Sequence, residues 1–127
     1  MQNNTTTKPL KQSKMNSKTI DIPIYMCKLT VIVTKDISVI AKKHKLTVDV
    51  SNFGAFTFKD EKNYRHYVMV LEDDWRSNVV HELVHVVNHI YLDCAMELDR
   101  HNDEPQAYLM GWLYEQIDKF LLMIKPE

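Results

Sequence analysis

The feature that most constrains the fold is a mainly apolar run from Val79 to Leu92. Its apolar side chains recur at helical spacing, at Val79, Leu83, Val86, Val87 and Ile90, and Val80, Val84 and Tyr91 widen the stripe. The polar side chains share a different angular sector, at Asn78, His81, His85, Asn88 and His89. This pattern predicts an α-helix that is buried on most sides, with its histidines facing out of the core.

The same run contains the sequence His81-Glu82-Leu83-Val84-His85, which is an H-E-x-x-H motif. Residues four apart lie on one face of a helix, so His81 and His85 can offer two imidazole nitrogens to one metal ion. Glu82 lies about 100° of helix rotation from His81, which suits a carboxylate that contacts a metal-bound water without ligating the metal. The alternative interpretation is a buried helix with core histidines whose hydrogen bonds are satisfied.

A chain of 127 residues with 45% hydrophobic residues supports one compact domain, which we expect over residues 19–127. Residues 1–18 contain four lysines, no acid and few large apolar groups, and they predict a disordered basic tail. A net charge of -1 does not favour binding to nucleic acid or to a membrane surface. No secretory signal pattern and no apolar run of roughly 20 residues occurs, so we expect a cytoplasmic protein.

The two cysteines, Cys27 and Cys94, lie far apart in the sequence and outside any C-x-x-C spacing. We expect reduced, partly buried thiols, with a disulfide as the less favoured alternative.

Residues before the motif alternate in a way that is typical of strands, and those after it predict a second long helix. The sequence predicts strands at 19–24, 28–34, 46–50, 53–58 and 64–71. It predicts a short helix after Asp36 and a central helix that is capped by Asp74 or Ser77. A final helix is predicted from Asp103 to about Ile124. Asp103 and Gln106 form a capping-box pattern. We therefore predict an α+β fold, a small and mostly antiparallel sheet with one short helix, followed by the motif helix and a long C-terminal helix.

Glu104 is the predicted third metal ligand, because catalytic zinc sites commonly use three protein ligands and leave one position for water. The eighteen residues 86–103 separate it from His85, and it falls in the first turn of the final helix. Tyr108 and Gly111 follow on the same helix face. We expect Gly111 to allow close approach of the two helices.

This H-E-x-x-H-x18-E spacing resembles that of the gluzincins, zinc peptidases with two histidines and a downstream glutamate. The short chain looks most like their minimal single-domain members, the minigluzincins, and the stretch from Asp103 to Trp112 is similar to one in small phage-encoded H-E-x-x-H proteins. The resemblance covers roughly residues 64–115. It implies a zincin-like fold and a zinc ion held by His81, His85 and Glu104. The chain departs from the metzincins, which would need glycine and histidine where it has Asn88 and Tyr91.

The resulting functional hypothesis is zinc-dependent hydrolysis of peptide bonds, with the metal-bound water activated by Glu82 as general base. Larger gluzincins stabilise the transition state with a downstream histidine or tyrosine, and the candidates for that role here are Tyr108, His89, His101 and Tyr114. Tyr108 is our assignment. A peptide or protein substrate would add as a strand along residues 53–58. The alternatives are an inactive metal-binding or assembly module on the same scaffold and a purely structural domain.

Overall fold

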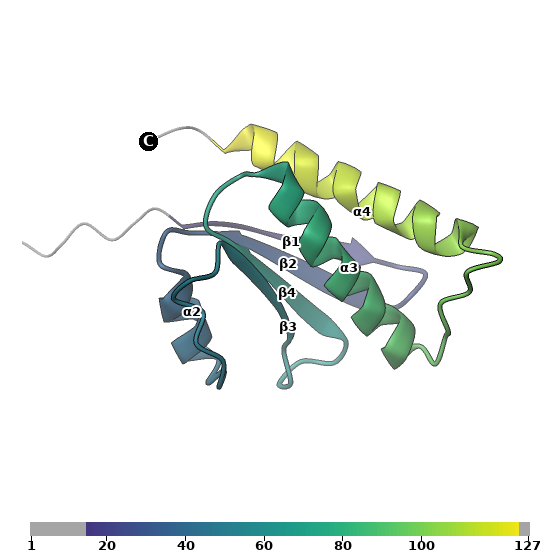
Figure 1. Cartoon of the computed structure of the whole chain (residues 1–127), viewed down its shortest axis with the longest axis horizontal. Coiled ribbons are helices and arrows are strands. Elements are labelled where there is room, and N and C mark those ends of the chain that lie inside the picture. Colours follow the sequence, from purple (N-terminus) through teal and green to yellow (C-terminus); the bar gives the residue numbers. More distant parts are fainter. Residues whose placement is uncertain (1–14, 125–127) are drawn as a thin grey trace, which may run out of the picture.

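The computed structural model describes residues 15–124, which form one mixed sheet and three helices (Figure 1). In chain order the elements are β1 (Asn16–Ile22), β2 (Cys27–Val33), α2 (Ile37–Lys43), β3 (Ala55–Lys59), β4 (His66–Leu71), α3 (Arg76–Asp93) and α4 (Glu104–Met123). No helix within these residues is long and apolar enough to cross a membrane.

The predicted tail falls mostly on residues that lie outside this description. Its last residues, however, belong to β1, which begins at Asn16 rather than at Thr19 and pairs with β2 along its full length. Asn16 lies opposite Val33, so the polar start of β1 is held by backbone hydrogen bonds rather than by apolar burial. Three residues of the predicted tail, 16–18, thus belong to β1.

The sheet order is β1-β2-β4-β3. The β1–β2 and β3–β4 pairs are antiparallel, whereas β2 and β4 are parallel. This parallel pair arises because α2 and the loop after it carry the chain to the far edge of the sheet, from which the β3–β4 hairpin returns beside β2. The prediction of an α+β fold is confirmed, with a mixed sheet.

Two apolar layers enclose the sheet. Tyr67, Met69 and Leu71 of β4 pack with α3 and α4 on one face. Val68 and Val70 of the same strand pack with α2 on the other face. Such alternation is what a strand produces when both faces of the sheet are covered. Figure 1 shows α3 and α4 side by side over the same face, running in opposite directions, and α2 apart from them.

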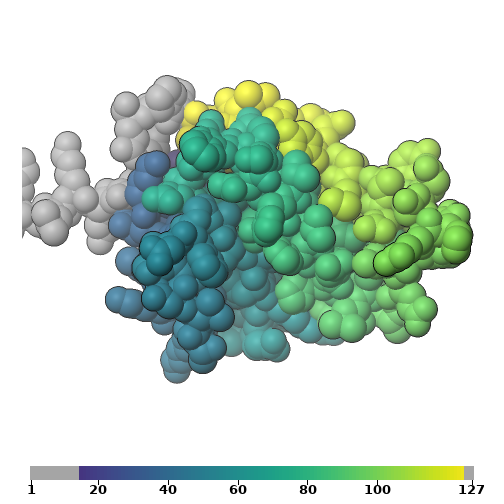
Figure 2. Space-filling view, in the orientation of Figure 1, coloured from purple at the N-terminus to yellow at the C-terminus, as the bar shows by residue number. Residues whose placement is uncertain are grey.

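The apolar stripe predicted for residues 79–92 is largely confirmed. Val79, Leu83, Val86, Val87 and Ile90 of α3 are buried, as are Leu109, Leu113, Ile117 and Leu121 of α4. Val80 and Val84 are instead exposed, because α3 covers the sheet with one face only. In the space-filling view the green atoms of α3 lie at the surface, beneath the yellow atoms of α4 (Figure 2).

Three local predictions are wrong. Residues 46–50 form no strand, since this segment is an irregular loop in which Val50 is buried and Val48 is exposed. Helix α3 has Trp75 at its N-cap, so neither Asp74 nor Ser77 caps it, and the Trp75 N–H donates a hydrogen bond to the side chain of Asp73. Asp103 does occupy the N-cap of α4, but its side chain makes no capping hydrogen bond.

Candidate metal centre

The histidines of the motif lie near the middle of α3, on the side that faces β3. His81 and His85 are exposed, whereas Glu82 is only 5% exposed although it is a neighbour of His81 in the chain. The difference follows from the helical period, which turns Glu82 toward the sheet and leaves the two imidazoles at the rim. The H-E-x-x-H motif is therefore divided between a buried acid and two accessible imidazoles.

His81, Glu82 and His85 form a group in which one potential ligand atom from each residue lies within 4.8 Å of the others. The two imidazole rings meet edge to face, with centroids 5.2 Å apart. His81 Nε2 lies 3.9 Å from Glu82 Oε2. Two nitrogens and one carboxylate oxygen thus converge on a common point, and such a donor set suits a first-row divalent metal such as zinc.

Thr57 fixes the other oxygen of the buried acid. Its hydroxyl donates a hydrogen bond of 2.7 Å to Glu82 Oε1. Thr57 lies in the middle of β3 opposite Met69 of β4, and Met69 belongs to the apolar layer under α3. The side chain of Thr57 therefore rises from the sheet toward α3. The motif does not point to Thr57; the alternation along residues 53–58, which separates Thr57 from Phe56 and Phe58, was the available signal.

A cavity of about 520 Å³ opens over this group. Residues 53–57 form one wall, and the other wall belongs to α3, at Asn78, His81, Glu82, His85 and His89. The strand that lines the cavity is an edge strand, because β3 pairs only with β4 among the described residues. The imidazoles therefore face a groove bounded by a sheet edge, and four of the five polar positions predicted to share one sector contribute to it.

His89 lies deeper along the same groove. Its ring stacks on the ring of Tyr67, with centroids 5.6 Å apart. Burial is the main cause that lowers the pKa of His89, and the nearby carboxylate of Asp93 partly opposes that effect. The neutral imidazole is thus favoured near neutral pH, where it can donate or accept a hydrogen bond. Of the four sequence candidates for transition-state stabilisation, His89 is the one that lines this cavity.

Glu104 and Tyr108, by contrast, are not brought to the histidines. Glu104 is exposed at the first residue of α4, and it is not part of the group formed by His81, Glu82 and His85. Tyr108 is 74% exposed and lines a different, largely apolar cavity beside the turn between β1 and β2.

The antiparallel packing of the two helices explains this separation, because α4 begins beside the end of α3 that is remote from the motif (Figure 1). Asp93, at that end, lies eight residues along the helix from His85, which is about 12 Å of rise. Gly111 does not support close approach of the helices either. It is exposed, and a Cβ atom there would meet nothing within 4 Å.

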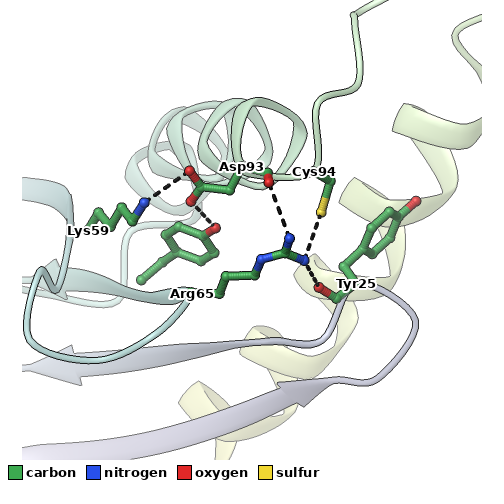
Figure 3. A network of polar contacts seen from close by, with 6 residues as sticks. Tyr25, Lys59, Arg65, Asp93 and Cys94 are labelled. Carbon is green, nitrogen blue, oxygen red and sulfur yellow. Dashed lines mark hydrogen bonds and ion pairs between the residues drawn. The ribbon is translucent and has the colours of Figure 1, made fainter.

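A polar network holds the C-terminal end of α3 against the sheet (Figure 3). The Asp93 carboxylate accepts hydrogen bonds from the Tyr67 hydroxyl and from Lys59 Nζ, the latter at 3.0 Å. The Arg65 guanidinium donates to the carbonyl oxygens of Tyr25 and Asp93 and contacts Cys94 Sγ at 3.5 Å. Strands β3 and β4, the turn between β1 and β2, and the end of α3 are thereby joined, which fixes the orientation of α3 over β3.

The charges of this network reinforce one another. The hydrogen bond from Tyr67, followed by that from Lys59, holds the pKa of Asp93 below its ordinary value in spite of burial. Burial, followed by the hydrogen bond to Asp93, raises the pKa of the Tyr67 phenol.

Burial also raises the pKa of the Cys27 thiol to about 11. Cys27 and Cys94 are both free thiols, as predicted.

Comparison of the chain with known protein families, with curated proteins and with solved structures gives no match. The chemistry of the site must therefore be argued from its own residues.

Proposed function

We propose that His81 and His85 hold a zinc ion and that the chain hydrolyses peptide bonds with Glu82 as the general base. The observation that carries this proposal is the groove itself, in which two accessible imidazoles and one buried carboxylate face an edge strand. A core helix with satisfied histidines would not leave both rings exposed.

The donor set fits a zinc ion. Ligand atoms bound tetrahedrally at about 2.0–2.3 Å lie roughly 3.5 Å apart, so atoms already within 4.8 Å of one another need only small side-chain rotations to close on it. A zinc ion bound there would supply a Lewis acid that lowers the pKa of water and polarises a carbonyl group. Because Glu104 lies elsewhere, we expect weaker metal affinity than three protein ligands give.

Glu82 is suited to proton transfer. Its Oε1 is held by Thr57, and its Oε2 remains directed toward His81 Nε2. An ionised carboxylate only accepts hydrogen bonds, so this oxygen can take a proton from an attacking water molecule and later deliver it to a leaving amine. His89, farther along the groove, can donate a hydrogen bond to the substrate oxygen as negative charge develops.

The edge strand β3 indicates an extended peptide as the substrate. A peptide can add to an unpaired edge through main-chain hydrogen bonds, and residues 53–57 place such an edge on the wall of the cavity opposite His81 and His85. This arrangement supports the hypothesis that the substrate strand runs along β3.

One observation favours a second candidate function, a metal site without hydrolytic activity. Glu82 Oε2 belongs to the same converging group as the two imidazoles. Within the described residues, no further histidine and no second acid joins that group. If Glu82 ligates the metal, it is not free to act as a base. The chain would then bind a metal to stabilise its fold or to join a partner.

Substitution of Glu82 separates the two candidates. In the peptidase, Glu82→Gln retains zinc binding measured by calorimetric titration and abolishes cleavage of a fluorogenic peptide library. In the non-catalytic site, the same change weakens zinc binding at least tenfold. His81→Ala should abolish binding in both cases, and the exposed His101, changed to alanine, is the matched control. A wild-type chain that binds zinc and cleaves no peptide would rule out the peptidase.

A further inference from the structure

We infer that Thr57 is a positioning residue that keeps Glu82 in the role of a base and prevents it from becoming a bidentate metal ligand. This inference rests on the proposed function, since it assigns Thr57 a task in the same site. The two oxygens of Glu82 have different surroundings, because Oε1 accepts the 2.7 Å hydrogen bond from Thr57 while Oε2 lies 3.9 Å from His81 Nε2. One oxygen is therefore tied to the sheet, and the other is left for chemistry.

The bond restricts the terminal torsion of Glu82. A glutamate carboxylate rotates broadly about its last bond, so a free Glu82 could turn both oxygens toward the point that the imidazoles share. With Oε1 tied to Thr57, bidentate ligation would require breaking a charge-assisted hydrogen bond at a residue that is 5% exposed. The carboxylate consequently presents only Oε2 toward the metal position.

The location of Thr57 makes this a rigid restraint. Thr57 lies in the middle of β3, where its backbone is held in register with Met69 of β4. Threonine is β-branched and has few accessible rotamers, so little entropy is lost when its hydroxyl is directed at one acceptor. A positioning group on a paired strand holds its target more precisely than one on a loop.

The contact also couples the acid to the substrate edge. Thr57 belongs to the strand segment that forms one wall of the cavity, and Glu82 belongs to the other wall. A peptide that pairs along β3 would contact the strand that carries the Thr57 hydroxyl. The base would then be aligned by the same strand that aligns the scissile bond.

The test compares Thr57→Val, which keeps the shape and removes the hydroxyl, with Thr57→Ser, which keeps the hydroxyl. Thr30→Val is the matched control. Thr30 is also a threonine in a strand, and its hydroxyl is hydrogen-bonded to the side chains of Thr19 at 2.9 Å and His66 at 2.7 Å. Its partner in β4 is Val68, which lies on the face of the sheet opposite to Thr57. Each full-length variant is loaded with Co²⁺, and its visible absorption, Co²⁺ affinity, kcat and KM are measured.

We expect Thr57→Val to lower kcat about 10-fold to 100-fold with little change in KM, which is the loss expected when one hydrogen bond to a charged group is removed. We also expect Co²⁺ affinity to rise about tenfold and the visible bands to weaken, because Glu82 adds a ligand and raises the coordination number. Thr57→Ser restores both properties toward wild type, and Thr30→Val changes neither. Adding Glu82→Gln to Thr57→Val removes the gain in affinity.

An unchanged Co²⁺ spectrum and unchanged kcat in Thr57→Val would overturn the inference, and so would a Thr57→Ser variant that behaves like Thr57→Val. If the wild-type chain binds Co²⁺ but cleaves no peptide, the peptidase proposal fails on its own. The spectroscopic comparison then still decides whether Thr57 prevents bidentate ligation of the metal by Glu82.

Discussion

Replacing Tyr67 with phenylalanine tests the network that fixes the end of α3. Tyr67 is fully buried, and its ring packs under α3, so phenylalanine keeps the packing and removes only the hydroxyl that bonds to Asp93. Hydrogen bonds to charged groups are worth about 1.5–3 kcal/mol. Because Asp93 keeps its bond from Lys59, we expect the lower end of that range, a loss of about 1.5 kcal/mol in the free energy of unfolding.

The assay is urea unfolding followed by far-ultraviolet circular dichroism. For slopes of about 1–3 kcal/mol per molar urea, a loss of about 1.5 kcal/mol lowers the midpoint by about 0.5–1.5 M at pH 7. The pKa of folded Asp93 lies below its unfolded value, so the carboxylate stabilises the fold above that unfolded pKa, about 3.9, and this contribution is lost as the pH falls through the folded pKa. The difference in the free energy of unfolding between wild type and Tyr67→Phe should therefore be largest at pH 7 and should decrease below about pH 4.

The matched control is Tyr64→Phe, at a side chain that is 80% exposed, and its free energy of unfolding should stay within about 0.5 kcal/mol of wild type. Equal midpoints for wild type and Tyr67→Phe at pH 7 would refute the role given to Asp93. A difference in the free energy of unfolding that increases as the pH falls would refute the direction assigned to the pKa of Asp93.

Four further outcomes are expected. Gly111→Ala, in open space on α4, should raise the free energy of unfolding by about 0.5–1 kcal/mol, whereas a loss would mean that the position is crowded. Leu113→Ala, at a fully buried position, should cost about 2–5 kcal/mol in the same urea assay; a smaller cost would contradict the packing of α4. Glu104→Gln should leave zinc affinity within twofold in a calorimetric titration, and a large loss would return Glu104 to the ligand set. Cys27, with its pKa raised to about 11, should react with a disulfide reagent at pH 8 far more slowly in the folded chain than in urea, and equal rates would contradict its burial.

The fold class could be predicted from the sequence because both periodicities are strong. The stripe that includes Val79, Leu83 and Ile90 identifies the buried face of α3, and the residues of β2 point to a central strand because large side chains occupy both faces. The parallel pairing of β2 with β4 could not be read in this way. It depends on which edge the chain reaches after α2, and that choice is made by tertiary packing of Val50, Phe56 and Phe58 against α2.

The site was predictable only as far as one helix extends. His81, Glu82 and His85 are neighbours because the helix makes them so, and the structure brings them together. Glu104 depends on how α4 docks, and a spacing of eighteen residues does not define the end of α3 at which α4 begins. Thr57 depends on the docking of α3 over β3, a contact between residues 25 positions apart in the chain.

The most direct test of the central claim is a zinc titration of the wild-type chain, His81→Ala and Glu82→Gln by calorimetry, with peptide hydrolysis measured on the same samples. We predict one zinc ion per wild-type chain, no binding by His81→Ala, and binding without hydrolysis by Glu82→Gln. A wild-type chain that binds no zinc, or a Glu82→Gln variant that still cleaves peptides, would contradict it.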